Sequence, residues 1–368
     1  MQVGEKHYRG IWLDEYDRGV VRVIDQRRLP FEFAELELRN ADDAFNAIAG
    51  MAVRGAPLIG ATGAWGLYLA TLSVGPYTNI ASYLDDTAAK LIAARPTAVN
   101  LEWAVSRVRK RLSGFCMSDQ LINEARRAAE EITDGEVESC RQIGIHGLPI
   151  IKEISKAKKG GTVNILTHCN AGWLATVDYG TALAPVYLAH SEGIDLHVWV
   201  DETRPRNQGS RLTCFELGAA GVPNTLITDN AGGLLMQKGM VDIVITGSDR
   251  TALNGDAANK IGTYLKALAA YDNNVPFYIA LPTSTIDISI EDGVRDIPVE
   301  QREAAEVLYT EGWSNDALVT VLTAPEGTRV SNYGFDITPA RYISGLITEK
   351  GVVKASKEGI MSLLKQQR

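Results

Sequence analysis

Apolar and polar residues change their spacing twice along the chain. Residues 8–38 hold short alternating runs bounded by Gly and Pro, such as Val-Val-Arg-Val-Ile-Asp at 20–25, a pattern typical of antiparallel strands. From about residue 42 to residue 147, apolar side chains recur every three or four positions, as at Ala44 and Ile48, which places them on one helix face. The first part of the chain is therefore predicted to be mostly helical, with a small antiparallel sheet at its start.

After the basic, glycine-containing segment 156–161 the pattern changes to short apolar runs separated by helix-length segments. This alternation predicts βαβ units, and continuous apolarity within a run indicates a strand covered on both faces. We expect an α/β protein with a helical N-terminal domain (residues 1–150) and a Rossmann-like, doubly wound parallel-sheet domain (residues 151–368). The expected parallel strands are 163–167, 196–200, 225–228, 243–246, 277–281 and 319–322.

Composition and charge narrow the class of partner. The net charge is −8 and basic residues form no long block, which argues against nucleic acid or anionic membrane as a partner and favours a small molecule. The long uncharged stretch 55–84 contains Gly, Pro, Thr and Ser, so it predicts a buried helix and a loop instead of a membrane span. The first residues lack the apolar core of a secretory signal, so we expect a cytoplasmic protein.

The cysteine and glycine patterns predict neither a metal nor a cofactor. The four cysteines, Cys116, Cys140, Cys169 and Cys214, lie far apart and form no Cys-x-x-Cys motif. The chain also has no Gly-x-Gly-x-x-Gly fingerprint and no P-loop, the usual reasons to propose a nucleotide.

In doubly wound sheets ligands bind beyond the carboxyl ends of the strands, so the residues that follow each run are the candidates for a site. Cys169 follows the run 163–167 and precedes a segment expected to be helical from about Trp173, whose N-terminus would stabilise a thiolate. A buried structural cysteine is the alternative. His168 either orients this thiol or satisfies a backbone carbonyl, and we assign it no catalytic role.

Two further strand ends carry candidate residues. The loop 201–211 is rich in Arg and holds Gln208 just ahead of the next helix, so it could bind phosphate or sugar hydroxyls, or be a solvated, salt-bridged loop. Asp249 follows the run 243–246 beside Arg250 and is a candidate proton donor, with helix capping as the alternative.

The helical part adds two breaks that combine an arginine with a turn. Arg54, Gly55 and Ala56 stand before Pro57, where the glycine lets a phosphate approach the backbone and the arginine supplies charge. Arg95 stands at a second break, before Pro96 and Thr97.

Taken together, six segments in order along the chain resemble the methylthioribose-1-phosphate isomerase family. They are Arg-Gly-Ala-Pro at 54–57, Arg-Pro-Thr-Ala-Val-Asn-Leu at 95–101, His-Cys-Asn-Ala-Gly at 168–172, Asp-Glu-Thr-Arg-Pro at 201–205, Gly-Ser-Asp-Arg at 247–250 and the run from Asn254 to Tyr264.

The resemblance implies a two-domain enzyme of methionine salvage, usually a homodimer, that isomerises a sugar phosphate without a cofactor. It implies that Cys169 and Asp249 are the catalytic residues. The substrate-binding residues that it implies are Arg54, Gly55, Ala56, Arg95, Gln208, Asn259 and Lys260.

From the sequence alone, alternatives remain open for both the mechanism and the substrate. Asp249 would protonate the ring oxygen of an aldose 1-phosphate, and Cys169 would then remove the C2 proton or assist a hydride shift. The family's pattern is not kept at 206–207, 229–232 and 332–336, which bears on the pocket for the sugar's 5-substituent. The alternatives are a related isomerase of 5-deoxyribose 1-phosphate or ribose 1,5-bisphosphate, and a regulatory protein that binds a sugar phosphate or nucleotide without catalysis.

Overall fold

The computed structural model describes residues 1–75, 79–95, 98–116 and 119–365. The N-terminal part begins with the predicted small antiparallel sheet, in the order β3-β4-β5. Val21 and Val23 of the middle strand are buried against the helices that follow. The strands of this part are β1 (Gln2–Val3), β2 (Lys6–His7), β3 (Ile11–Leu13), β4 (Val21–Ile24) and β5 (Glu35–Leu38).

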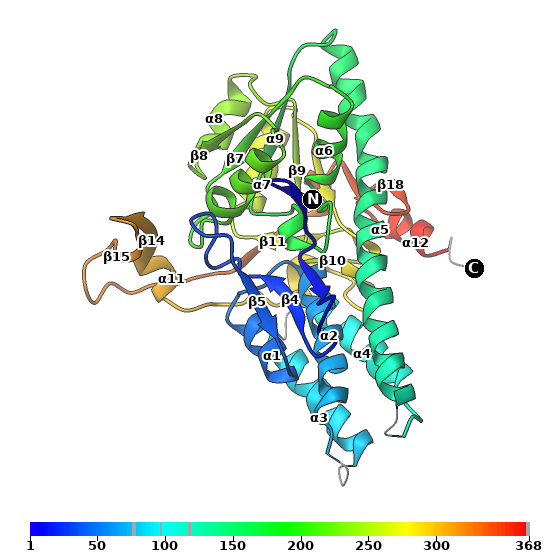
Figure 1. Cartoon of the computed structure of the whole chain (residues 1–368). Coiled ribbons are helices and arrows are strands. Elements are labelled where there is room, and N and C mark those ends of the chain that lie inside the picture. Colours follow the sequence, from blue (N-terminus) through cyan, green and yellow to red (C-terminus); the bar gives the residue numbers. More distant parts are fainter. Residues whose placement is uncertain (76–78, 96–97, 117–118, 366–368) are drawn as a thin grey trace.

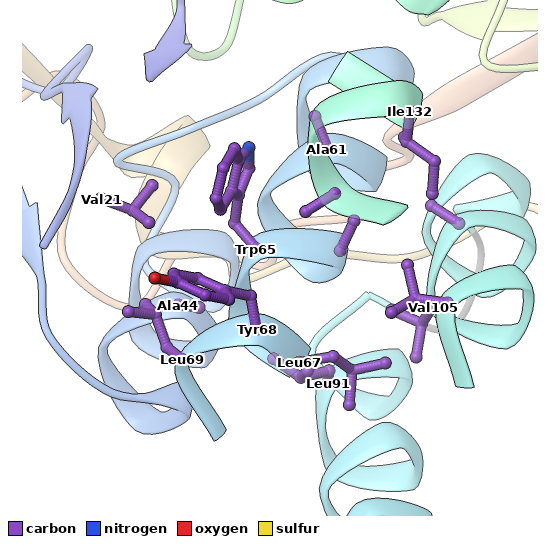
Figure 2. Packing of buried hydrophobic residues seen from close by; sticks show 14 of the residues in the cluster. Val21, Ala44, Ala61, Trp65, Leu67, Tyr68, Leu69, Leu91, Val105 and Ile132 are labelled. Carbon is purple, nitrogen blue, oxygen red and sulfur yellow. The ribbon is translucent and has the colours of Figure 1, made fainter. Parts of the chain in front are cut away.

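Five helices follow and form the first hydrophobic core. Helix α2 is buried along almost its whole length, which explains why its sequence is apolar on all sides. Figure 2 shows Trp65 and Tyr68 of this helix among the aliphatic side chains of the neighbouring elements. None of the described helices combines the length and apolar character needed to cross a membrane. The helices are α1 (Ala41–Ala49), α2 (Ala56–Leu72), α3 (Ile80–Ala93), α4 (Val99–Arg111) and α5 (Asp119–Ala157).

Helix α5 is 39 residues long and runs beside both parts of the molecule (Figure 1). In its first half, Thr133 accepts a hydrogen bond from the Trp65 indole at 2.9 Å. In its second half, Gly147 packs so closely on Pro185 of α6 (Ala184–Ser191) that a methyl group there would clash. Residue 150 lies within this shared helix, and the division into domains 1–150 and 151–368 stays a prediction.

A seven-stranded sheet forms the second part, in the order β18-β17-β12-β9-β6-β7-β8, and all its strands are parallel except β18. The predicted fold class, a helical part followed by a doubly wound sheet, is confirmed. The strands are β6 (Val163–Thr167), β7 (Leu196–Asp201), β8 (Asn224–Ile227), β9 (Ile243–Thr246), β12 (Phe277–Ala280), β17 (Gly345–Thr348) and β18 (Gly351–Val353).

Successive residues of a strand point to opposite faces of the sheet, and both faces are covered. Ile165 of β6 packs in one core with α5, α6 and α7, whereas Leu166 packs in another with α8, α9 and α12. The chain proceeds from β6 outward to β7 and β8, then returns to β9 on the other side of β6. This reversal makes the carboxyl ends of β6 and β9 the expected ligand site. The helices are α7 (Cys214–Ala219), α8 (Ala231–Gln237), α9 (Thr263–Asp272) and α12 (Lys357–Lys365).

The prediction for residues 319–322 was wrong. They belong to β15 (Ala317–Leu322), which pairs with β14 (Tyr309–Ser314) in an antiparallel hairpin that projects from the body (Figure 1). No residue of β15 is buried, so the apolar run reflects a half-exposed hairpin instead of a covered strand. The sixth parallel strand is β17, whose four residues are all buried.

A second, four-stranded sheet follows β9 in the order β13-β10-β11-β16. Its strands are β10 (Arg250–Ala252), β11 (Ala257–Lys260), β13 (Ile286–Asp287) and β16 (Phe335–Thr338). Two short helices, α10 (Gly293–Asp296) and α11 (Ala305–Leu308), stand in the connections. The chain therefore enters a strand directly after Asp249, so this residue does not cap a helix.

Candidate active site

Cys169 lies two residues beyond β6, in a left-handed backbone conformation with φ +66°. This conformation is uncommon for residues other than glycine, and it is held by a hydrogen bond from the Cys169 N–H to Thr203 Oγ1 at 2.8 Å. The expected helix after Cys169 is absent: a short 3₁₀ turn, Trp173–Ala175, follows, and α6 begins only at Ala184. Positive charge near the sulfur must therefore come from a side chain.

Arg54 supplies that charge. Its Nη2 lies 3.6 Å from Cys169 Sγ, and its Nη1 donates to Asn170 Oδ1 at 2.7 Å. Arg54 is positioned by Gly55, which has φ +86° and starts α2. A Cβ atom at Gly55 would lie 2.1 Å from the Ala175 carbonyl oxygen, so only glycine allows the two segments to meet here. A cationic donor directed at a cysteine sulfur stabilises negative charge on it.

Asp249 lies at the carboxyl end of β9, and its backbone N–H donates to the Ala258 carbonyl at 2.9 Å. Burial raises the pKa of the Asp249 carboxyl above its usual value, while Lys260, Arg95 and Arg54 oppose the rise. A raised pKa keeps a carboxylic acid protonated to higher pH, as a proton donor requires.

Lys260 and Asn259 lie on β11, next to these residues. Burial lowers the pKa of Lys260, and its ammonium group donates to the Gly334 carbonyl at 3.1 Å and lies over the Phe335 ring. The Asn259 amide donates to Thr263 Oγ1 at 2.9 Å. Both side chains are buried beside Cys169 and Asp249, a placement suited to holding a polar ligand.

Arg95 and Gln208 carry polar atoms without a hydrogen-bond partner in the described part of the chain. These atoms are Arg95 Nε and Gln208 Oε1. Burial lowers the pKa of Arg95. Buried polar groups are normally paired, so these atoms have capacity for a ligand. Pro96 and Thr97, the rest of the predicted turn at Arg95, lie outside the described residues.

Nearly all the predicted residues line one pocket, here termed the central pocket. It is lined by Met51, Arg54, Gly55, Ala56, Ile59, Arg95, Ala98, Cys169, Gln208, Asp249, Arg250, Ala258, Lys260, Ile297, Pro298 and Phe335. Asn259 lines an adjoining pocket, to which Cys169 and Asp249 also contribute. The lining of the central pocket mixes cationic and apolar side chains: Arg95 Nη1 lies 2.9 Å from Met51 Sδ, and the Lys260 ammonium lies over the Phe335 ring.

The apolar side chains that line the central pocket were not predicted from the sequence. They come from separate parts of the chain and are Met51, Ile59, Ala98, Ile297, Pro298 and Phe335. These side chains carry no chemistry of their own, and the apolar pattern of the helix and the strand that hold Ile59 and Phe335 indicates core packing, not a site. Only the fold could assign these side chains to the site.

The arginines of loop 201–211 have partners within the protein. Arg204 Nη1 donates to Thr310 Oγ1 at 2.8 Å. Arg206 and Arg211 form ion pairs with Glu306 and Glu311 at 2.9 and 2.6 Å. The salt-bridged alternative is observed for Arg206 and Arg211, whereas Arg204 forms hydrogen bonds to neutral groups, and all three link the loop to α11 and the β14–β15 hairpin.

His168 belongs to a buried charge network. Its Nε2 contacts the Ile261 carbonyl oxygen, and its Nδ1 contacts Asp201, with Asp229 farther away. Among the described residues, His168, Asp201 and Asp229 are the only group with the spacing of metal ligands. The Lys266 ammonium already lies 3.1 Å from Asp201 Oδ2, so a cation of the protein itself neutralises this group.

Known proteins resemble the chain over its whole length. It is 58% identical over 363 residues to methylthioribose-1-phosphate isomerase of Desulfatibacillum aliphaticivorans, covering 99% of this chain and 98% of that protein. It is 53% identical over 365 residues to the Escherichia coli O45:K1 (strain S88 / ExPEC) protein of that name, covering 99% and 96%.

Two crystal structures, each 37% identical in sequence, resemble the fold. One is 5-methylthioribose 1-phosphate isomerase from Pyrococcus horikoshii OT3, with a TM-score of 0.83 over 98% of this chain and 97% of that one. The other is described as translation initiation factor eIF-2B, subunit delta, from A. fulgidus, with a TM-score of 0.80 over 98% and 100%. The Initiation factor 2 subunit family matches residues 52–355. The chain therefore belongs to the Initiation factor 2 subunit family and, within it, to the methylthioribose-1-phosphate isomerases.

Proposed function

We propose that the protein converts 5-methylthioribose 1-phosphate into 5-methylthioribulose 1-phosphate, an aldose–ketose isomerisation of methionine salvage. The observation that carries this proposal is that Cys169 and Asp249 line one pocket together with Lys260 and three arginines, Arg54, Arg95 and Arg250. A thiol and a carboxylic acid supply the two proton-transfer groups of the reaction, and the cationic side chains suit the phosphate.

Ring opening is assigned to Asp249. Its carboxyl protonates the ring oxygen, the bond from C1 to this oxygen breaks, and positive charge is left at C1 and the phosphate ester oxygen. The charge makes the C2 hydrogen acidic and C1 electrophilic. The raised pKa of Asp249, caused by burial, supports this role as acid.

Hydrogen transfer from C2 to C1 is assigned to the surroundings of Cys169. By the enol route, the thiolate takes the C2 proton and the C2–H electron pair forms a C1–C2 double bond; the Cys169 thiol then protonates C1 while the C2 hydroxyl gives its proton to the Asp249 carboxylate and becomes a ketone. By the hydride route, hydrogen moves from C2 to C1 with its electron pair while the C2 hydroxyl gives its proton to the Asp249 carboxylate. Deuterium from D2O at C1 of the product identifies the enol route.

The apolar side chains that line the central pocket favour a methylthio group over a second phosphate. Ile59, Ile297 and Pro298 offer no hydrogen-bond donor and no charge. Moving a phosphate dianion from water into contact with such side chains is costly, whereas a thioether gains from apolar contact. This separates the proposed substrate from ribose 1,5-bisphosphate.

A panel of sugar phosphates tests the proposal. Ketose formation by the purified protein is measured with 5-methylthioribose 1-phosphate, 5-deoxyribose 1-phosphate and ribose 1,5-bisphosphate. We expect kcat/KM for the first to exceed that for the bisphosphate by about 100-fold or more, equivalent to about 3 kcal/mol. The greatest turnover on the bisphosphate would overturn the substrate, and no turnover on any of the three would favour the regulatory alternative.

We further propose that the protein acts in the cytoplasm as a homodimer and does not bind nucleic acid. The net charge of −8 opposes binding to a polyanion. The edge strand β8 exposes Leu226 and the adjacent helix α8 exposes Leu234, each about half accessible, so this edge can pair with a second copy. Sedimentation equilibrium checks the dimer, and a gel-shift assay with mixed DNA and RNA checks the second point.

A further inference from the structure

The carboxamide of Asn170 joins the site to a buried carboxylate. Asn170 is 3% exposed and follows Cys169 directly. Its Nδ2 donates to Glu216 Oε1 at 2.9 Å and to Thr213 Oγ1 at 3.2 Å, and its Oδ1 accepts from Arg54 Nη1 at 2.7 Å. One side chain therefore contacts Glu216 on one side and Arg54 on the other.

Glu216 fixes which way this carboxamide points. Its Oε1 also accepts from the Leu174 N–H at 2.9 Å, and its Oε2 accepts from the Trp173 N–H and the Tyr187 hydroxyl, both at 2.8 Å. Donors thus surround both oxygens, so Glu216 acts as an acceptor toward Asn170. The NH2 group must face Glu216, which leaves Oδ1 facing Arg54.

Asn170 in turn holds the guanidinium of Arg54 at two points. Besides the bond to Oδ1, Arg54 Nη2 donates to the Asn170 carbonyl oxygen at 3.2 Å. A planar guanidinium held at both nitrogens has little rotational freedom. In this orientation the same Nη2 lies 3.6 Å from Cys169 Sγ.

We propose that Asn170 is a positioning residue that directs Arg54 at the sulfur of Cys169, with Glu216 setting the orientation of its carboxamide. Asn170 acts on the reaction through Arg54. The inference rests on the proposed function for the role of Cys169, but it concerns a property of the protein without substrate and is tested there.

Alkylation of Cys169 by iodoacetamide, followed by mass spectrometry of the peptide that carries it, measures this property in the full chain. A thiol of ordinary acidity is mostly ionised at pH 10, so the alkylation rate at this pH reports access to the sulfur. The ratio of the rate at pH 7 to the rate at pH 10 reports how far the protein favours the thiolate. The ratio cancels changes in access that a merely structural variant causes.

We expect this ratio to fall about tenfold in Asn170→Ala and by a similar factor in Arg54→Met, with no further fall in the double variant, because both remove one interaction. Tyr187→Phe is the matched control, because it removes one donor from Glu216 without touching Asn170, and its ratio is unchanged.

Two results overturn the inference. In the first, the Asn170→Ala ratio stays within twofold of the wild type while the Arg54→Met ratio falls. In the second, neither ratio falls. If Asn170→Ala does not fold, Asn170→Ser, whose hydroxyl is too short to span both partners, takes its place with the same criteria. Failure on the sugar panel with these ratios as expected would overturn the proposed function alone.

Discussion

Nδ1 of His168 lies 2.9 Å from a carboxylate oxygen of Asp201, and both side chains are fully buried. The opposite nitrogen of the ring contacts the Ile261 carbonyl at 2.8 Å. The pair therefore connects three segments: the one that carries Cys169, the end of β7, and the segment directly after Lys260. His168 acts in the architecture of the site, in agreement with the expectation that it satisfies a backbone carbonyl.

Replacing His168 by Ala should destabilise the fold. In this variant the buried Asp201 carboxylate keeps Lys266 as a partner but loses the imidazole, and the contact with the Ile261 carbonyl is lost as well. We therefore expect a loss of about 2–3 kcal/mol in the free energy of unfolding. Urea denaturation measures the loss. His146→Ala is the control, because the His146 ring contacts only the Thr348 carbonyl in the described structure and no carboxylate. Equal losses in the two variants would argue against a special role of the His168–Asp201 pair.

The raised pKa of Asp249 predicts how activity depends on pH. If Asp249 must be protonated to act as the acid, kcat falls as pH rises through the pKa of its carboxyl. We therefore expect Asp249 to set the alkaline limb of the pH profile, the range in which kcat falls with rising pH. Glu300 is among the groups that raise this pKa, and Glu300→Gln removes that charge. The alkaline limb of kcat should then move to lower pH, by a fraction of a unit. A limb that stays in place, or moves to higher pH, would contradict Asp249 as the acid.

Glu136 on α5 offers a prediction about stability. Burial and the nearby charge of Glu349 raise its pKa from 4.5 to about 7. Because the folded-state pKa is raised, ionisation costs stability: the cost is absent below pH 4.5, grows as pH rises toward 7 and is complete above. Glu136→Gln should therefore stabilise the protein at pH 8 by up to about 3 kcal/mol and leave it unchanged at pH 4.

Glu138, on the same helix, is the matched control for Glu136. Its pKa is lowered to about 2 by Arg141, so its charge is favourable in the folded state. Glu138→Gln should give no gain at pH 8. Thermal unfolding of both variants at the two pH values measures the difference. Stabilisation by Glu138→Gln, or none by Glu136→Gln, would contradict the argument from burial.

The sheet could be predicted where strands are buried on both faces, because continuous apolar runs identify them. The strand β17 escaped prediction because it begins with glycine and lies far along the chain from its neighbour β12. The run 319–322 was misassigned because hydropathy alone does not separate a covered strand from one in an exposed hairpin.

The site was predictable to the extent that its residues follow strand ends. Cys169 and Asp249 follow β6 and β9, the neighbours at which the strand order reverses. The link from Asn170 to Arg54 was not predictable, because 116 positions separate these residues in the sequence. The source of charge beside Cys169 was expected in a helix N-terminus, and the structure puts a guanidinium there instead.

We propose above that Cys169 and Asp249 transfer the protons of an aldose–ketose isomerisation. The most direct test is the turnover of 5-methylthioribose 1-phosphate by Cys169→Ser and Asp249→Asn, beside Cys214→Ser as a control cysteine outside the central pocket. We predict that kcat falls by about 10³-fold or more in each of the first two variants, with folding retained, and stays near the wild-type value in the third. Activity within tenfold of the wild type in either Cys169→Ser or Asp249→Asn would contradict the claim.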